Sequence, residues 1–121
     1  MPATTLSINE ILNYHFGKQA YCQSAPATMY FGLSTTLVTA SGWSSVTEPA
    51  AGYARVSYTN DTNGWTTSTT GTLSNKLDVV FPESTAAQGT MLSLFIIDTD
   101  SGAGDVLWYT PLAPSILVQG N

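Results

Sequence analysis

Alternation of apolar and polar residues along the chain predicts a protein built mainly from short strands. The run from Thr28 to Ser34 places Met29, Phe31 and Leu33 on one side, which is the two-residue period of a half-covered strand. Similar runs bounded by turn residues occur at 53–59, 65–72, 77–81, 90–98, 106–110 and 116–119. Such a series is typical of a mainly β fold, and we expect an antiparallel β-sandwich or jelly roll.

One segment near the start of the chain has a helical period instead. A single helix face would carry the apolar residues Ile8, Ile11, Leu12 and Phe16. Ser7 and Glu10 match a capping box, and Gly17 is a natural stop. We therefore expect one short N-terminal helix. Because a helix of this length is unstable alone in water, its apolar stripe should pack against the rest of the protein.

The strand predicted at 90–98 is apolar on both faces, since Leu92, Leu94 and Ile96 alternate with Met91, Phe95 and Ile97. A strand of an antiparallel sandwich normally exposes one face to water, so both faces here need cover. We expect the N-terminal helix to cover one of them. Contact with another subunit is the alternative, and it makes Phe95 and Ile97 candidate interface residues.

Length and composition indicate a single domain over residues 1–121 that can bury a core without disulfides or metal. Hydrophobic residues make up 43% of the chain, whereas charged residues make up only 9%. Three Lys and Arg residues cannot neutralise many phosphates, which argues against nucleic acid as a partner. A surface so poor in charge suits a protein that packs against neighbours, although secreted polar β-proteins share this feature.

The N-terminal residues lack the pattern of a signal peptide, and no stretch approaches the ~20 apolar residues of a membrane span. We therefore expect synthesis in the cytoplasm and no membrane partner. Cys22 is the only cysteine, so an intramolecular disulfide is excluded.

Catalytic and metal-binding patterns are weak. His15 is the only histidine, and neither a nucleophilic triad nor a His/Cys metal spacing can be assembled around it. Asp98 and Asp100 begin a loop that superficially resembles a calcium site but fails the EF-hand pattern, because Tyr109 stands where the final carboxylate belongs. The two carboxylates could in principle serve as general acid and base in glycoside hydrolysis, but the sequence around them does not indicate a substrate pocket. We expect no catalytic, cofactor or metal site, and a protein that is not an enzyme.

The three tryptophans are candidates for stacking on a sugar or for anchoring an interface. Trp43 and Trp65 lie in polar, glycine-flanked contexts and are interpreted as candidate exposed interface residues. Trp108 lies in an apolar strand and is interpreted as a core residue.

The segment 48–56 contains the only arginine, at the point where a long polar loop gives way to a strand. Alternation places Arg55 on the same face as Tyr53. The planar guanidinium can span several acceptors, so we interpret Glu48, Tyr53 and Arg55 as a structural joint that fixes the loop. The alternative is a surface ion pair that contributes little to stability.

Several short motifs occur in an order that resembles small phage and prophage virion proteins of the tail-fibre-like kind. The motifs are Phe16-Gly17, Tyr30-Phe31-Gly32-Leu33, Gly52-Tyr53-Ala54-Arg55-Val56, Phe81-Pro82-Glu83, Gly89-Thr90 and Ile97-Asp98. One position departs from that family, because Gln88 stands where its members often carry Trp.

The resemblance implies a structural protein of the virion. The role that we expect first is a capsid cement or decoration protein of jelly-roll type, located on the capsid surface. Its partners would be the major capsid protein and further copies of itself, as a dimer or trimer. A tail or baseplate component is the alternative. A carbohydrate-binding β-sandwich that uses Trp43 or Trp65 is a third hypothesis.

Overall fold

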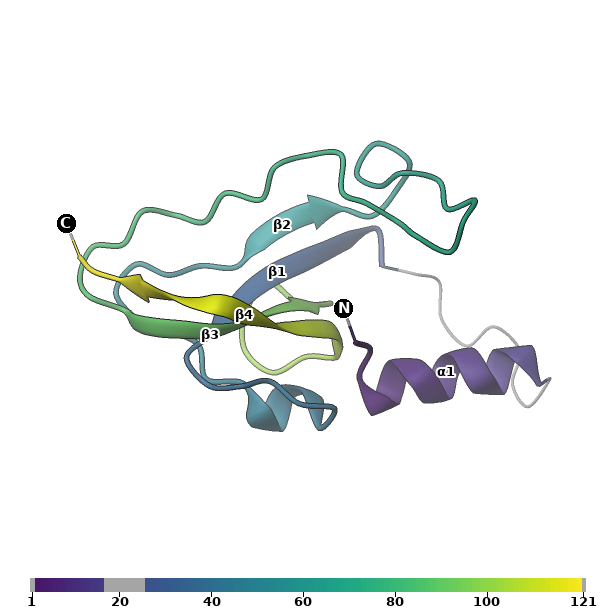
Figure 1. The fold of residues 1–121 in the computed structure, drawn as a ribbon, viewed down its shortest axis with the longest axis horizontal. Coiled ribbons are helices and arrows are strands. Elements are labelled where there is room, and N and C mark those ends of the chain that lie inside the picture. The colour runs from purple at the N-terminus through teal and green to yellow at the C-terminus, as the bar shows by residue number, and fades with distance from the viewer. Residues whose placement is uncertain (1, 17–25, 121) are drawn as a thin grey trace.

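The computed structural model describes residues 2–16 and 26–120. The described part contains helix α1 (Thr5–His15), the 3-10 helix η1 (Gly42–Ser45) and the strands β1 (Thr28–Ser34), β2 (Val56–Thr59), β3 (Gly89–Ile97) and β4 (Val106–Val118). The strands form one antiparallel sheet in the order β2-β1-β3-β4 (Figure 1). The prediction of a mainly β, antiparallel, sandwich-like domain with one short N-terminal helix is confirmed.

The layers that flank the sheet consist of loops rather than a second sheet. The segments 65–72 and 77–81, expected to be strands, are irregular apart from one bridge between Trp65 and Asn75. The Thr-rich segment 65–72 has too little apolar surface to hold a further strand in register. In the segment 77–81, Val79 and Phe81 pack their side chains onto the sheet without pairing with a strand. The two runs predicted at 106–110 and 116–119 join in β4, and the pairing with β3 shifts between Met91 and Ser93.

One face of the sheet is covered by the loop of residues 35–47, which includes η1. Phe95 and Ile97 of β3 pack there with Val38 from the loop and Val106 of β4. Gly32 of β1 pairs with Phe95 and leaves room for its ring, since a Cβ at Gly32 would overlap three ring carbons. Phe95 and Ile97 are both 0% exposed, so their cover comes from within the chain rather than from a subunit interface.

Buried hydroxyl groups fasten this loop to the sheet. Ser34 Oγ accepts a hydrogen bond of 3.0 Å from the N–H of Thr47, and Ser93 Oγ accepts one of 3.0 Å from the N–H of Val38. The ends of the loop meet where the Thr35 N–H donates to the Thr47 carbonyl at 2.8 Å. The segment therefore forms a compact closed loop that bonds to the sheet through the N–H groups of Val38 and Thr47 and otherwise bonds largely to itself.

The opposite face of the sheet is covered by the segment that follows β2. Phe31, Tyr58 and Ile96 form its buried cluster, and the segment contributes Trp65, Val79 and Phe81. Both apolar faces of β3 are therefore covered by loops. Figure 1 shows η1 on one side of the sheet and the 60–88 segment on the other.

The helix does not cover the sheet as expected. Helix α1 begins at Thr5 instead of after Ser7, because Thr4 Oγ1 accepts the N–H of Ser7 at 3.4 Å and takes the capping role. Residues 2–4 pair with the edge of β4, where the Thr4 N–H donates to Leu107 O at 3.1 Å and the Tyr109 N–H donates to Pro2 O at 3.0 Å. This pairing places α1 beyond the end of the sheet (Figure 1).

No helix in residues 2–16 and 26–120 is long and apolar enough to cross a membrane.

The contact between Gly32 and Phe95 gives a stability prediction. We expect Gly32→Ala to lower the free energy of unfolding by about 1–3 kcal/mol, because the added methyl group overpacks against the ring. Chemical denaturation measures the change. The double variant Gly32→Ala/Phe95→Leu should be less destabilised than the sum of its single changes, since the smaller side chain relieves the overlap. Additive effects would contradict this account of the contact.

Candidate functional site

A buried arginine connects three loops of the molecule. Arg55 lies directly before β2, and its side chain is 1% exposed. Nε donates to Glu48 Oε1 at 2.8 Å and Nη2 donates to Glu48 Oε2 at 2.9 Å, so the two side chains form a bidentate pair. Such pairing combines charge with a fixed geometry, which suits a partly buried site.

The remaining guanidinium N–H groups bind the loop between β3 and β4. Nη1 donates to the carbonyl of Thr99 at 2.8 Å and to its Oγ1 at 3.0 Å. Nη2 donates also to the carbonyl of Gly102 at 2.6 Å. All five N–H groups of Arg55 therefore have acceptors, which is what burial of this cation requires.

Aromatic rings complete the surroundings of Arg55. The guanidinium carbon lies 5.0 Å from the centre of the Trp43 ring and 6.0 Å from that of Phe95. These distances fall within the range of cation–π attraction, which strengthens when water is excluded. Trp43 belongs to η1, so the same cation also holds the loop of residues 35–47.

Tyr53 ties the pair to the sheet. Its hydroxyl donates to Glu48 Oε1 at 2.9 Å and accepts from the N–H of Leu33 in β1 at 2.9 Å. Burial raises the pKa of Tyr53, and the adjacent negative charge of Glu48 adds to this although the Leu33 N–H opposes it. The phenol therefore stays neutral and serves as a fixed hydrogen-bonding group.

The turn that precedes Tyr53 has its own support. Ala51 and Gly52 adopt positive φ values of 57° and 81°. The Ala51 carbonyl accepts from Gln88 Nε2 at 3.0 Å and from the N–H of Thr85 at 3.2 Å. The amide of Gln88 thus holds the turn through a polar contact.

The structure brings Glu48, Tyr53 and Arg55 together, with Trp43 beside them. The carbonyl contacts of Thr99 and Gly102 could not be foreseen, because a backbone carbonyl is present at every residue and carries no sequence signal. The chemistry of this site is structural, since its acceptors and donors are occupied by one another. We refer to Glu48, Tyr53, Arg55 and Trp43 as the joint.

The exposures of the tryptophans differ from the sequence-based expectation. Trp65 is half-buried, with its ring centre 4.9 Å from that of Tyr58 and 6.2 Å from that of Phe31. Trp43 is half-buried against Arg55. Trp108, expected in the core, is 36% exposed, because it lies on the edge strand β4. Neither Trp43 nor Trp65 is a free exposed platform.

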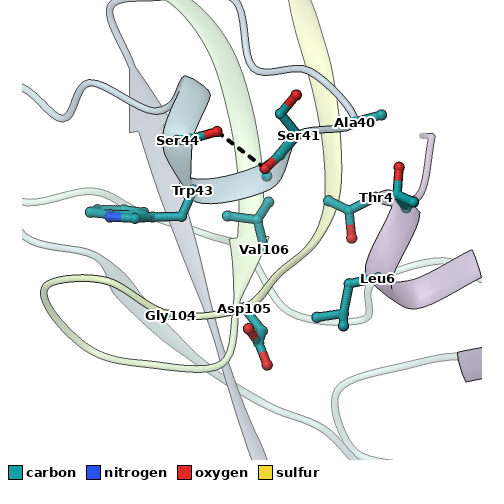
Figure 2. Close-up of a pocket in the computed structure, with 11 residues that line it drawn as sticks. Thr4, Leu6, Ala40, Ser41, Trp43, Ser44, Gly104, Asp105 and Val106 are labelled. Atoms are coloured by element: carbon teal, nitrogen blue, oxygen red, sulfur yellow. Dashed lines mark hydrogen bonds between the residues drawn. The ribbon is translucent and has the colours of Figure 1, made fainter. Parts of the chain in front are cut away.

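A hollow of about 470 Å³ lies between the start of α1, η1 and the loop before β4. Thr4, Leu6, Ser41 and Asp105 line it, together with Trp43. Figure 2 shows the Trp43 ring extending away from the side of the hollow that Thr4 and Leu6 form. Asp105 is the single ionisable residue among the described residues that line this hollow, so the hollow offers no acid–base pair for catalysis.

The aspartates after β3 act as turn residues. Asp98 Oδ1 accepts the backbone N–H of Asp105 at 2.8 Å, which closes the loop between β3 and β4. Within residues 2–16 and 26–120, no group of three or more His, Cys, Asp or Glu side chains is placed to hold a metal ion. Cys22 lies outside the described residues.

The joint gives a prediction for Arg55→Lys. We expect a loss of about 2 kcal/mol in the free energy of unfolding, because an ammonium group has three donors and cannot reach Glu48 and both loop carbonyls together. Chemical denaturation measures it. Lys76→Ala serves as the control, since its ammonium group bonds an exposed carbonyl of Thr62, and it should change stability by no more than about 0.5 kcal/mol. Equal effects of the two changes would rule out a stabilising joint.

The raised pKa of Tyr53 predicts a dependence of stability on pH. The folded protein holds the phenol proton more tightly than the unfolded chain, whose tyrosines titrate at about pH 10. The stabilisation is therefore complete below about pH 10 and is lost as pH rises above it. Urea midpoints measured from pH 8 to 11 should fall less steeply for Tyr53→Phe than for the unchanged protein. Identical slopes would refute the assignment.

Comparison with known proteins supplies the setting for these features. A search of curated proteins found no significant match. A family profile described as podophage GP4 fiber I protein gp80 matches residues 2–121. Because the match spans nearly the whole chain, the protein belongs to this family of phage fibre-like virion structural proteins.

Proposed function

We propose that this chain is a non-enzymatic structural subunit of a phage fibre. The observation that carries the proposal is the family match over residues 2–121 to a fibre protein. The geometry supports it, because the donors of Arg55 are occupied by acceptors within the domain. These internal contacts hold the loops in place. A site of this kind preserves a shape, which is the requirement of a structural subunit.

A capsid cement protein that bridges major capsid proteins is the alternative within the virion. Low charge and a small sheet with both faces covered suit a cement protein as well as a fibre subunit. The family match names a fibre protein, and we therefore rank the fibre first. The carbohydrate-binding hypothesis loses its platform, since Trp43 and Trp65 pack within the domain.

The position of the protein in the virion tests the proposal. Gly71 lies in an exposed loop and has no neighbouring atoms within 4 Å of an added Cβ, so an epitope inserted there should leave the fold intact. Gold-labelled antibody on intact particles should mark the fibres, and particles without the epitope provide the background. Label distributed over the capsid shell would overturn the fibre assignment in favour of cement.

A further inference from the structure

Helix α1 presents its apolar side to solvent. Three residues of this side and Phe16, which directly follows the helix, are here called the α1 stripe. Their exposures are 45%, 47%, 48% and 73%, for Ile8, Ile11, Leu12 and Phe16 respectively. Among the described side chains, Ser7 of this helix is buried and Glu10 is half-buried, and both are polar. A helix of a monomeric protein normally has the opposite arrangement, with its apolar side inward.

The apolar surface of the α1 stripe is comparable to the largest patch on a typical soluble protein, and such patches are often functional. At roughly 150–250 Å² for a large side chain, these exposed fractions correspond to roughly 400 Å² of surface on the α1 stripe. Contiguous apolar patches of a few hundred Å² on soluble proteins commonly mark interaction sites. A helix of 11 residues is also marginal in water without packing. Both facts require a partner surface.

Charge indicates what the partner is. The chain has a formal charge of −5, so two copies repel each other where their acidic groups approach. Glu10 is the only Asp, Glu, Lys or Arg of α1, and it lies on the half-buried side of the helix. The α1 stripe is therefore a surface where two identical copies can meet without repulsion between like charges.

We propose that the α1 stripe is a self-association surface, on which α1 of a second copy of this chain packs helix against helix. A contact between identical stripes covers both at once, whereas docking on any other surface of a neighbour would leave that neighbour's stripe exposed. Ridges of one helix fit the grooves of the other in such packing. The arm-like position of α1 beyond the end of the sheet leaves room for it (Figure 1).

The inference depends on the proposed function only for its setting in a fibre. Two stripes together bury roughly 800 Å², plus the polar atoms around them, which is below the roughly 1,200–2,000 Å² of stable specific interfaces and is the size of a weak, transient contact. The association should therefore be reversible in solution and reach completion at the high local concentration of an assembled particle.

Sedimentation of the purified full chain over about 1–500 µM, the range for an interface of this size, tests the proposal. The unchanged chain should form dimers or higher species as concentration rises. Ile11→Asp and Leu12→Asp should weaken this association at least about tenfold, because each buries a charge in an apolar contact. Val80→Asp is the matched control, since Val80 is 75% exposed but lies outside α1, and it should associate as the unchanged chain does.

Circular dichroism checks that the Asp variants keep their helical content. A second kind of variant tests the contact without relying on the Asp variants. Ile11→Cys in a Cys22→Ser background should form an intermolecular disulfide on oxidation, whereas Val80→Cys in the same background should not. An unchanged chain that stays monomeric throughout, or cross-linking equal at both positions, would overturn the proposal. If the gold label lies on the capsid while cross-linking is specific to Ile11, the proposed fibre function is refuted and the self-association surface stands.

Discussion

The buried guanidinium of Arg55 is the constraint on which the arrangement of the loops depends. A cation that is almost fully removed from water must have every donor occupied, or the desolvation cost is not recovered. Its acceptors come from Glu48, from Thr99 and from Gly102, and Trp43 packs on it. Each of these segments must be in position for the others to be stable, so the loops fold as one cooperative unit rather than independently.

Loops can replace a second sheet because the chain supplies polar groups that bind them. Buried hydroxyls of Ser34 and Ser93 take up backbone N–H groups of the loop that covers Phe95 and Ile97. Tyr58, inside the opposite cluster, donates its hydroxyl to the Gly64 carbonyl and accepts the N–H of Leu77. A chain with few charges thus uses hydroxyl groups to bind the backbone of its covering loops, and hydroxyl groups cost less to bury than ions.

The parts of the structure that follow local rules could be predicted from the sequence. The period-two pattern located β1 at Thr28–Ser34, and the doubly apolar run predicted a strand covered on both faces, which β3 is. The joint could be anticipated because the chain has a single arginine, Arg55, and this arginine stands where a polar loop enters a strand. The segments that cover β3 and the position of α1 could not be predicted from the sequence, because both depend on contacts between segments far apart in the chain.

The pairing of residues 2–4 with β4 has a consequence for how copies of the chain can join. An unpaired edge strand is a template on which further strands add without limit. Here the backbone of Pro2 and Thr4 occupies part of that edge, and further along β4 the prolines at 111 and 114 lack the N–H that a new strand would need. Growth of the sheet from chain to chain is therefore obstructed on this side. Joining through side chains ends when the surfaces are covered, so it yields assemblies of defined size.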